Sequence, residues 1–154
     1  MSDDVIMAET DEAALGVLEG LVGYHIRRAS SVFATDFSRA LAGTGMRQVL
    51  FGILSVVGAN PGINQGAAGR SLGIQRANMV SLMNELVDAG LLDRKTAAED
   101  RRAFALNLSA AGETMLSDCL ARIEAHECEM LVDFSATDRR ALIALLIKVE
   151  ARER

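Results

Sequence analysis

The chain has 154 residues, of which 50% are hydrophobic, and a formal net charge of −5. A hydrophobic fraction of this size excludes a disordered chain and predicts one compact, mainly helical domain with a core of its own. The apolar runs are much shorter than the roughly 18 residues of a membrane span, and the first residues lack a signal-peptide pattern, so we expect a cytoplasmic protein without a membrane partner.

The charge is spread unevenly along the chain. Residues 1–20 carry −6 and residues 109–154 carry −3, whereas residues 21–60 carry +3 and residues 61–108 carry +1. Sign asymmetry of this kind permits a local surface for nucleic acid on an acidic protein. A charge of +1 on residues 61–108 is by itself weak support for nucleic-acid binding. That prediction therefore depends on the sequence motifs.

Two helices are predicted before residue 60. Apolar residues recur every three or four positions from Leu15 to Leu41, which is the spacing of one long amphipathic helix. The stretch 42–45 contains two glycines and ends this helix, and Thr44 is a candidate cap for a second helix over Met46–Val57. The second helix is apolar on nearly every side, so we expect it to be buried on most faces.

Two short helices around a tight turn are predicted next. Asn64 can cap a helix over Gln65–Leu72, Gly73 breaks it, and a second helix follows over Gln75–Ala89 with Gly90 at its end. This is the order of a helix-turn-helix, which places its second helix in the major groove of DNA.

A hairpin with a charged tip is predicted after these helices. The strands are Leu91–Thr96 and Ala103–Leu108, and the connection between them contains Asp100, Arg101 and Arg102. A guanidinium on a narrow tip can enter a minor groove, where the electrostatic potential is most negative. Two further basic residues, Arg94 and Lys95, lie at the base of the hairpin.

Two more helices are predicted after residue 108. Ser109 is the candidate cap of the first, and Thr137 is the candidate cap of the last. The opening helix of the chain, at about 28 residues, would be about 40 Å long, which is more than one small domain covers. Its apolar stripe is therefore expected to meet a second copy of the chain, and a homodimer is predicted.

The outer side of the helix over Gln75–Ala89 carries polar residues that suit base edges. They are Gln75, Arg76, Asn78, Ser81 and Asn84. Gln and Asn can pair with adenine, and Arg can pair with guanine. An ordinary solvated helix face has the same composition, and a winged helix used only for protein contacts is a further alternative. The basic hairpin favours DNA over both, because a protein-binding module has no need of a basic tip.

The segment from Asn64 to Gly112 resembles the winged helix-turn-helix of the MarR family of bacterial regulators. The resemblance is carried by the turn Leu72-Gly73, by ELVDAGLLDR before the hairpin, by EDRR at its tip and by LNLSAAG after it. It implies a mainly α fold with a small β-hairpin wing, in a triangular homodimer. The implied organisation is a single domain over 1–154, with a winged helix-turn-helix at 61–108 inside a DNA-binding lobe at 46–108, and dimerisation helices at 11–42 and 109–152.

Roles for individual residues also follow from the resemblance. Asp100 and Arg102 resemble a pair that braces the wing, and Arg101 resembles a minor-groove contact. Many relatives carry other residues at the positions of Gln75 and Ser81, so an operator sequence cannot be transferred. The complete set of expected DNA contacts is Gln65, Arg70, Gln75, Arg76, Asn78, Ser81, Arg94, Lys95, Arg101 and Arg102.

The resemblance further implies a repressor that a small, often phenolic, molecule releases from a pseudo-palindromic operator. The expected effector is an aromatic acid or its acyl thioester, because an arginine suits an anion and tyrosine and histidine suit hydroxyl or carbonyl groups. The expected lining is Tyr24, His25 and Arg28 with Met46, Phe51 and Leu54. The open alternative is that His25 and Arg28 make structural contacts at a subunit interface.

Other classes of function have less support in the sequence. A thiol-based redox sensor would use Cys119 or Cys128, which are expected instead to be reduced and packed. The histidines His25 and His126 lie far apart without a ligand cluster, so no metal site is predicted. No nucleophile or phosphate-loop motif indicates an enzyme, and no cofactor is expected.

Overall fold

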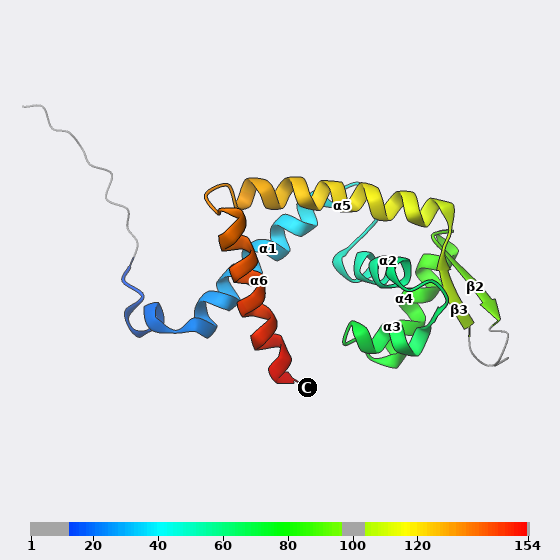
Figure 1. The fold of residues 1–154 in the computed structure, drawn as a ribbon, viewed down its shortest axis with the longest axis horizontal. Coiled ribbons are helices and arrows are strands. Elements are labelled where there is room, and N and C mark those ends of the chain that lie inside the picture. The colour runs from blue at the N-terminus through cyan, green and yellow to red at the C-terminus, as the bar shows by residue number, and fades with distance from the viewer. Residues whose placement is uncertain (1–12, 97–103, 154) are drawn as a thin grey trace, which may run out of the picture. The chain divides into compact units, whose positions relative to one another are not determined.

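A computed structural model of the chain describes residues 13–96 and 104–153 (Figure 1). The chain divides into two compact units, residues 1–35 and residues 36–154. The boundary falls within one helix, α1 (Val22–Ala40), and each unit is described by itself below. None of the helices in the described ranges has the length and apolar character that crossing a membrane requires.

The first unit begins with a short 3-10 helix, η1 (Gly16–Gly20), followed by the first part of α1. The prediction of one helix from Leu15 is therefore wrong, since the α-helix begins at Val22 after an extended Leu21. Gly16 has a φ of +58°, which a right-handed α-helix does not use, and the glycines around it weaken α-helix formation. The apolar side chains of Val17 and Val22 are exposed within the described chain.

The core of the second unit is built around helix α2 (Gln48–Ala59), whose Ile53, Leu54 and Val57 are fully buried. This confirms the prediction of a helix buried on most faces. The helix begins two residues later than expected, and Thr44 does not cap it. The Thr44 hydroxyl instead donates to Leu41 O and accepts from the Met46 backbone N–H, so it stabilises the turn before α2.

The predicted helix-turn-helix is present as α3 (Gln65–Ser71) and α4 (Arg76–Asp88). Asn64 caps α3 as expected, since its side-chain oxygen accepts a 2.8 Å hydrogen bond from the Ala67 backbone N–H. Gly73, with a φ of +65°, forms the turn between the two helices. Helix α4 directs Met79, Met83 and Leu86 into the core, with Leu82 and Val87 partly buried beside them, and leaves its outer side exposed.

The wing consists of the antiparallel strands β2 (Leu92–Thr96) and β3 (Phe104–Leu108), within one residue of the prediction. A third strand, β1 (Ile63–Asn64), pairs with β3 and was not predicted, because two residues are too few to show a pattern. The sheet order is β1-β3-β2. The tip residues, with Asp100, Arg101 and Arg102, lie outside the described residues.

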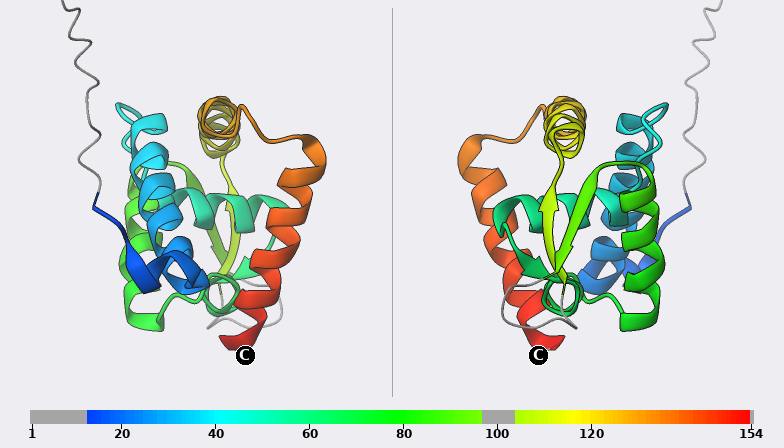
Figure 2. Two further views of the ribbon diagram at one scale, coloured as in Figure 1. Left: turned by 90° about the vertical axis from the view of Figure 1, so that its left-hand side faces the viewer. Right: turned by 90° about the vertical axis from the view of Figure 1, so that its right-hand side faces the viewer.

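Helices α5 (Ala110–Met130) and α6 (Ala136–Glu150) follow the wing, and a short 3-10 helix, η2 (Ala151–Glu153), ends the described chain. Helix α5 begins at the wing and meets α6 at its other end (Figure 1). Figure 2 shows α2 lying under α5, against β3. Ser109 caps α5 as predicted, but Ser135 rather than Thr137 caps α6. The reason is that Ser135 and Asp138 form a capping box, with a hydrogen bond in each direction.

We expect Ser135→Ala to lower the free energy of unfolding by about 1 kcal/mol, because it removes the cap of α6. Hydrogen bonds from Ser135 hold the pKa of the Asp138 carboxyl below its ordinary value. A carboxyl with a lowered folded pKa stabilises above the unfolded pKa, near about 4, and loses this effect as the pH falls through the folded pKa. Denaturant unfolding should therefore show a smaller difference between wild type and variant at about pH 3 than at neutral pH. An equal difference at both would contradict the capping box.

Candidate nucleic-acid interface

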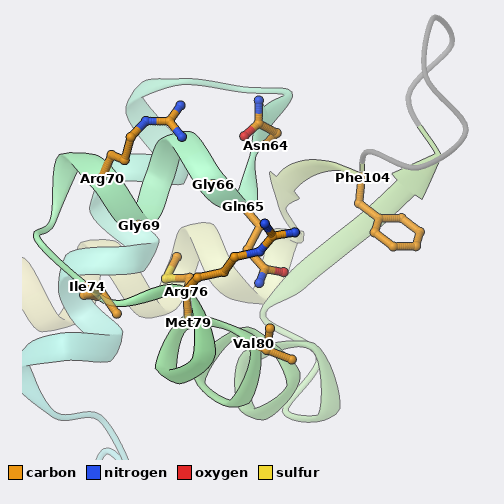
Figure 3. Close-up of a pocket in the computed structure, with 10 residues that line it drawn as sticks. All are labelled: Asn64, Gln65, Gly66, Gly69, Arg70, Ile74, Arg76, Met79, Val80 and Phe104. Atoms are coloured by element: carbon orange, nitrogen blue, oxygen red, sulfur yellow. The ribbon is translucent and has the colours of Figure 1, made fainter.

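A groove of about 520 Å³ lies between α3, the first half of α4 and strand β3 (Figure 3). Its lining residues come from all three elements of the winged helix-turn-helix. They are Asn64, Gln65, Gly66, Gly69, Arg70, Ile74, Arg76, Met79, Val80 and Phe104. Three predicted DNA contacts, Gln65, Arg70 and Arg76, are therefore brought together on one concave surface.

Close packing of α3 against the turn positions this surface. A Cβ at Gly69 would lie 3.3 Å from Ile74 O and 3.5 Å from Met79 Cγ, so glycine allows a close approach that a larger residue would oppose. The buried Ala68 and Met79 complete the contact between the two helices. Gln65 and Arg76, which are the first residues of α3 and α4, are thereby held at the groove (Figure 3).

The groove is electropositive. Arg70 and Arg76 both line it, no acidic residue does, and neither arginine forms an ion pair within residues 13–96 and 104–153. The N-terminus of α4, at Arg76, adds the partial positive charge of its backbone N–H groups. A groove with two arginines that lack an acidic partner in the described chain is suited to an anion such as a DNA strand.

Arg94 ties the wing to α4. Its Nη2 donates a 2.8 Å hydrogen bond to Asn84 Oδ1, and its guanidinium lies 6.0 Å from the centre of the Phe104 ring. The side chain is half-buried, unlike the exposed Lys95 beside it. The predicted DNA contact Arg94 therefore also holds β2 against the helix that carries the outer polar residues.

The remaining predicted contacts on α4 and at its N-cap are not among the residues that line the groove. Gln75, Asn78 and Ser81 are exposed, and Gln75 is the N-cap residue without a side-chain capping bond. The predicted contacts Arg101 and Arg102, and the predicted brace Asp100, lie outside the described residues. Their roles, like those of the other predicted contacts, stay predictions.

An ion pair that sequence reasoning missed joins α4 to α2. The two terminal nitrogens of Arg47, Nη1 and Nη2, donate to the two oxygens of the Glu85 carboxylate, at 2.6 and 2.8 Å. The pair raises the pKa of Arg47 and lowers that of Glu85, with the hydrogen bond as the main cause for each. The partners are separated by 37 intervening residues in the sequence, so no local pattern could have indicated them. They fix the second half of α4, at Glu85, to the start of α2.

Residues predicted for the effector lie in both units. In the first unit, Arg28 Nη1 donates a 3.2 Å hydrogen bond to the Tyr24 hydroxyl, and His25 lies edge-on to the Tyr24 ring. In the second unit, Leu54 is fully buried, Phe51 packs edge-on against Phe37, and Met46 lines a cavity of about 190 Å³. That cavity is also lined by Leu50, Leu86 and Met115. Tyr24, His25 and Arg28 thus form one cluster, whereas a joint site stays a prediction.

The cysteines differ from one another. Cys119 is buried, and burial raises the pKa of its thiol, which disfavours the reactive thiolate. Cys128 is exposed in the described chain, with Arg139 Nη1 3.7 Å from its Sγ, so the expectation that it is packed is wrong.

The histidine His126 binds the Asp36 carboxylate at 2.9 Å. Across residues 13–96 and 104–153 no three potential metal ligands gather.

Proteins similar to this chain are transcriptional regulators. The model of the MarR family matches residues 45–103. A protein of Thauera aromatica, named as a transcriptional regulatory protein for the hcr operon, is 34% identical over 146 residues, covering 90% of this chain and 86% of that protein. The structure of the transcriptional repressor CouR bound to a 23-mer DNA duplex is 30% identical, with a TM-score of 0.85 over 90% of this chain and 99% of CouR. CouR bound to p-coumaroyl-CoA is 29% identical, with a TM-score of 0.78 over 93% of this chain and 100% of CouR.

Proposed function

Because the chain belongs to the MarR family of transcriptional regulators, we propose that it is a homodimeric repressor that binds duplex DNA through α4 and the groove beside it. The observation that carries this proposal is the electropositive groove, in which Arg70 and Arg76 lack an acidic partner within the described residues. The similar repressor CouR, whose structure contains a 23-mer duplex, supports it.

The homodimer is supported by apolar side chains that the single chain leaves in solvent. Helix α6 has no buried residue among those described. Its apolar side chains Ile143, Leu145 and Ile147 are each more than half exposed. Burial of such surface is the main driving force of protein association. A two-fold dimer would present two copies of α4, so its operator should be an inverted repeat with half-sites roughly 10 base pairs apart.

Selection from a pool of random duplexes tests this function. We expect the wild-type protein to enrich inverted repeats with that spacing, and sedimentation to give the mass of one dimer on each enriched duplex. The absence of enrichment, or binding of a single chain, would contradict the proposal.

We further propose that an aromatic acid or its acyl thioester releases the protein from DNA. The cluster of Tyr24, His25 and Arg28 supplies a cation beside two groups that can bind hydroxyl or carbonyl oxygens. CouR, solved with p-coumaroyl-CoA, supports an effector of this class. The effector acts only if it binds the DNA-free conformation more tightly than the DNA-bound one.

Arg28→Ala should raise the effector concentration needed for release by about tenfold, because it removes a charge-assisted hydrogen bond. Affinity for DNA without effector should be unchanged. Arg27→Ala is the matched control, since Arg27 also lies over the Tyr24 ring, whereas the hydrogen bond to the Tyr24 hydroxyl comes from Arg28. The measurement is fluorescence anisotropy of a labelled operator titrated with aromatic acids and their coenzyme A thioesters. Release by peroxide alone, abolished in Cys128→Ser, would replace this proposal with thiol sensing.

A further inference from the structure

The groove contains an apolar patch that the predicted DNA contacts do not explain. Within the described part of residues 46–108, the large hydrophobic residues that are exposed are Val80, at 45%, and Phe104, at 47%. Both line the same groove, Val80 from α4 and Phe104 from β3 (Figure 3). The core side of α4 consists of Met79, Met83 and Leu86, so Val80 is not needed for packing there.

Helix stability does not account for Val80 either. A β-branched residue is a poorer helix former than the straight-chain polar residues that usually occupy exposed helix positions. Val80 therefore exposes apolar surface in a position where a polar residue would cost the fold nothing. Apolar surface that is exposed in a binding groove is suited to an apolar part of the ligand.

The neighbours of Val80 determine which ligand fits. Arg76, Val80 and Asn84 are spaced by four, so they form one stripe along α4. Arg76 is in the electropositive groove, and Asn84 is held by Arg94 of the wing. The ligand must therefore be anionic and also present a small apolar group beside the cation. B-DNA does so in the major groove, where thymine alone carries a 5-methyl group and side-chain methyl groups contact it.

We propose that Val80 is a specificity-determining residue that contacts the 5-methyl group of a thymine in each half-site. This inference rests on the proposed DNA-binding function. Val80 follows Arg76 by four residues, which is about 6 Å along the helix axis and corresponds to roughly two base-pair steps. The thymine is thus within about two base pairs of the position that Arg76 contacts.

Replacing thymine by deoxyuridine tests the contact, because it removes only the methyl group and keeps the base pair. The two thymines at equivalent positions of the two half-sites are replaced together, one such symmetric pair at a time. The dissociation constants of the wild type and Val80→Ala are measured for each duplex. At one symmetric pair, deoxyuridine should weaken wild-type binding by about fourfold per half-site. For Val80→Ala, deoxyuridine at that pair should cause no further loss of affinity. At every other thymine, deoxyuridine should change the affinity of Val80→Ala as it changes that of the wild type.

Phe104→Ala is the matched control, since it removes the other exposed apolar side chain of the groove. Phe104→Ala should lower the affinity for all duplexes by the same factor. Replacing thymine by deoxyuridine should change its affinity as it changes that of the wild type. The proposal is overturned if Val80→Ala responds like the wild type at every thymine, if Phe104→Ala abolishes the same response, or if the selected duplex has no thymine within this distance. Failure of the wild type to select any duplex would instead overturn the proposed function.

Discussion

Gly112→Ala should lower the free energy of unfolding by about 3 kcal/mol, because the added methyl group meets backbone that cannot rotate away. A Cβ at Gly112 would overlap with the carbonyl group of Leu91. The first turn of α5 packs directly on this backbone: Ser109 Oγ donates to Gly90 O at 2.6 Å, and Ser109 N donates to Leu91 O at 3.1 Å. The alanine methyl would separate α5 from the end of α4.

Gly52→Ala is the control for this experiment. Gly52, like Gly112, lies in a helix of the second unit. It is half-buried where Gly112 is buried, and its Cβ would meet only Leu72 Cδ2, at an ordinary contact distance of 3.4 Å. Since alanine is the better helix former, this variant should be as stable as wild type or up to about 1 kcal/mol more stable. Denaturant unfolding gives both values. Equal midpoints for Gly112→Ala and wild type would show that α5 does not pack on Leu91 as described.

Arg76→Ala should weaken binding to the selected duplex by about 5-fold to 150-fold per half-site, because it removes from each half-site a base contact worth about 1–3 kcal/mol. The preference at one position of each half-site should relax at the same time, since a guanidinium that pairs with guanine selects that base. The thermal midpoint should not change, because the described residues form no ion pair with Arg76.

Arg39→Ala removes the same charge from the last turn of α1, outside the groove, and should leave the affinity for DNA nearly unchanged. Binding curves at several salt concentrations separate a base contact from a phosphate contact. If Arg76→Ala lowers the affinity for every duplex equally and reduces the salt slope by about 1, Arg76 binds phosphate and does not read a base.

Elements defined by local chemistry could be predicted from the sequence. Asn64 and Ser109 cap their helices, and Gly90 follows α4 with a φ of +71°, because capping depends on neighbouring residues alone. The start of α1 was misplaced because apolar spacing continued through glycines that favour other conformations. The cap of α6 was placed at Thr137 although Ser135 has the partner three residues later that a capping box needs.

The candidate site was predictable only in part, for a physical reason. Arg70 and Arg76 were expected from the motif, and the structure places both in the groove. Val80 and Phe104 were missed, because the exposure of an apolar residue depends on how separate elements pack. The spacing of Met79, Met83 and Leu86 was the available signal, since it leaves Val80 off the core side of α4.

Competition binding measures directly whether the protein recognises a particular DNA sequence. A labelled duplex obtained by selection is bound to the wild-type protein and displaced with the same duplex, unlabelled, or with an unrelated duplex of equal length. If the protein recognises its sequence specifically, displacement needs at least about 1,000-fold more of the unrelated duplex. Equal displacement by the two duplexes would contradict specific recognition.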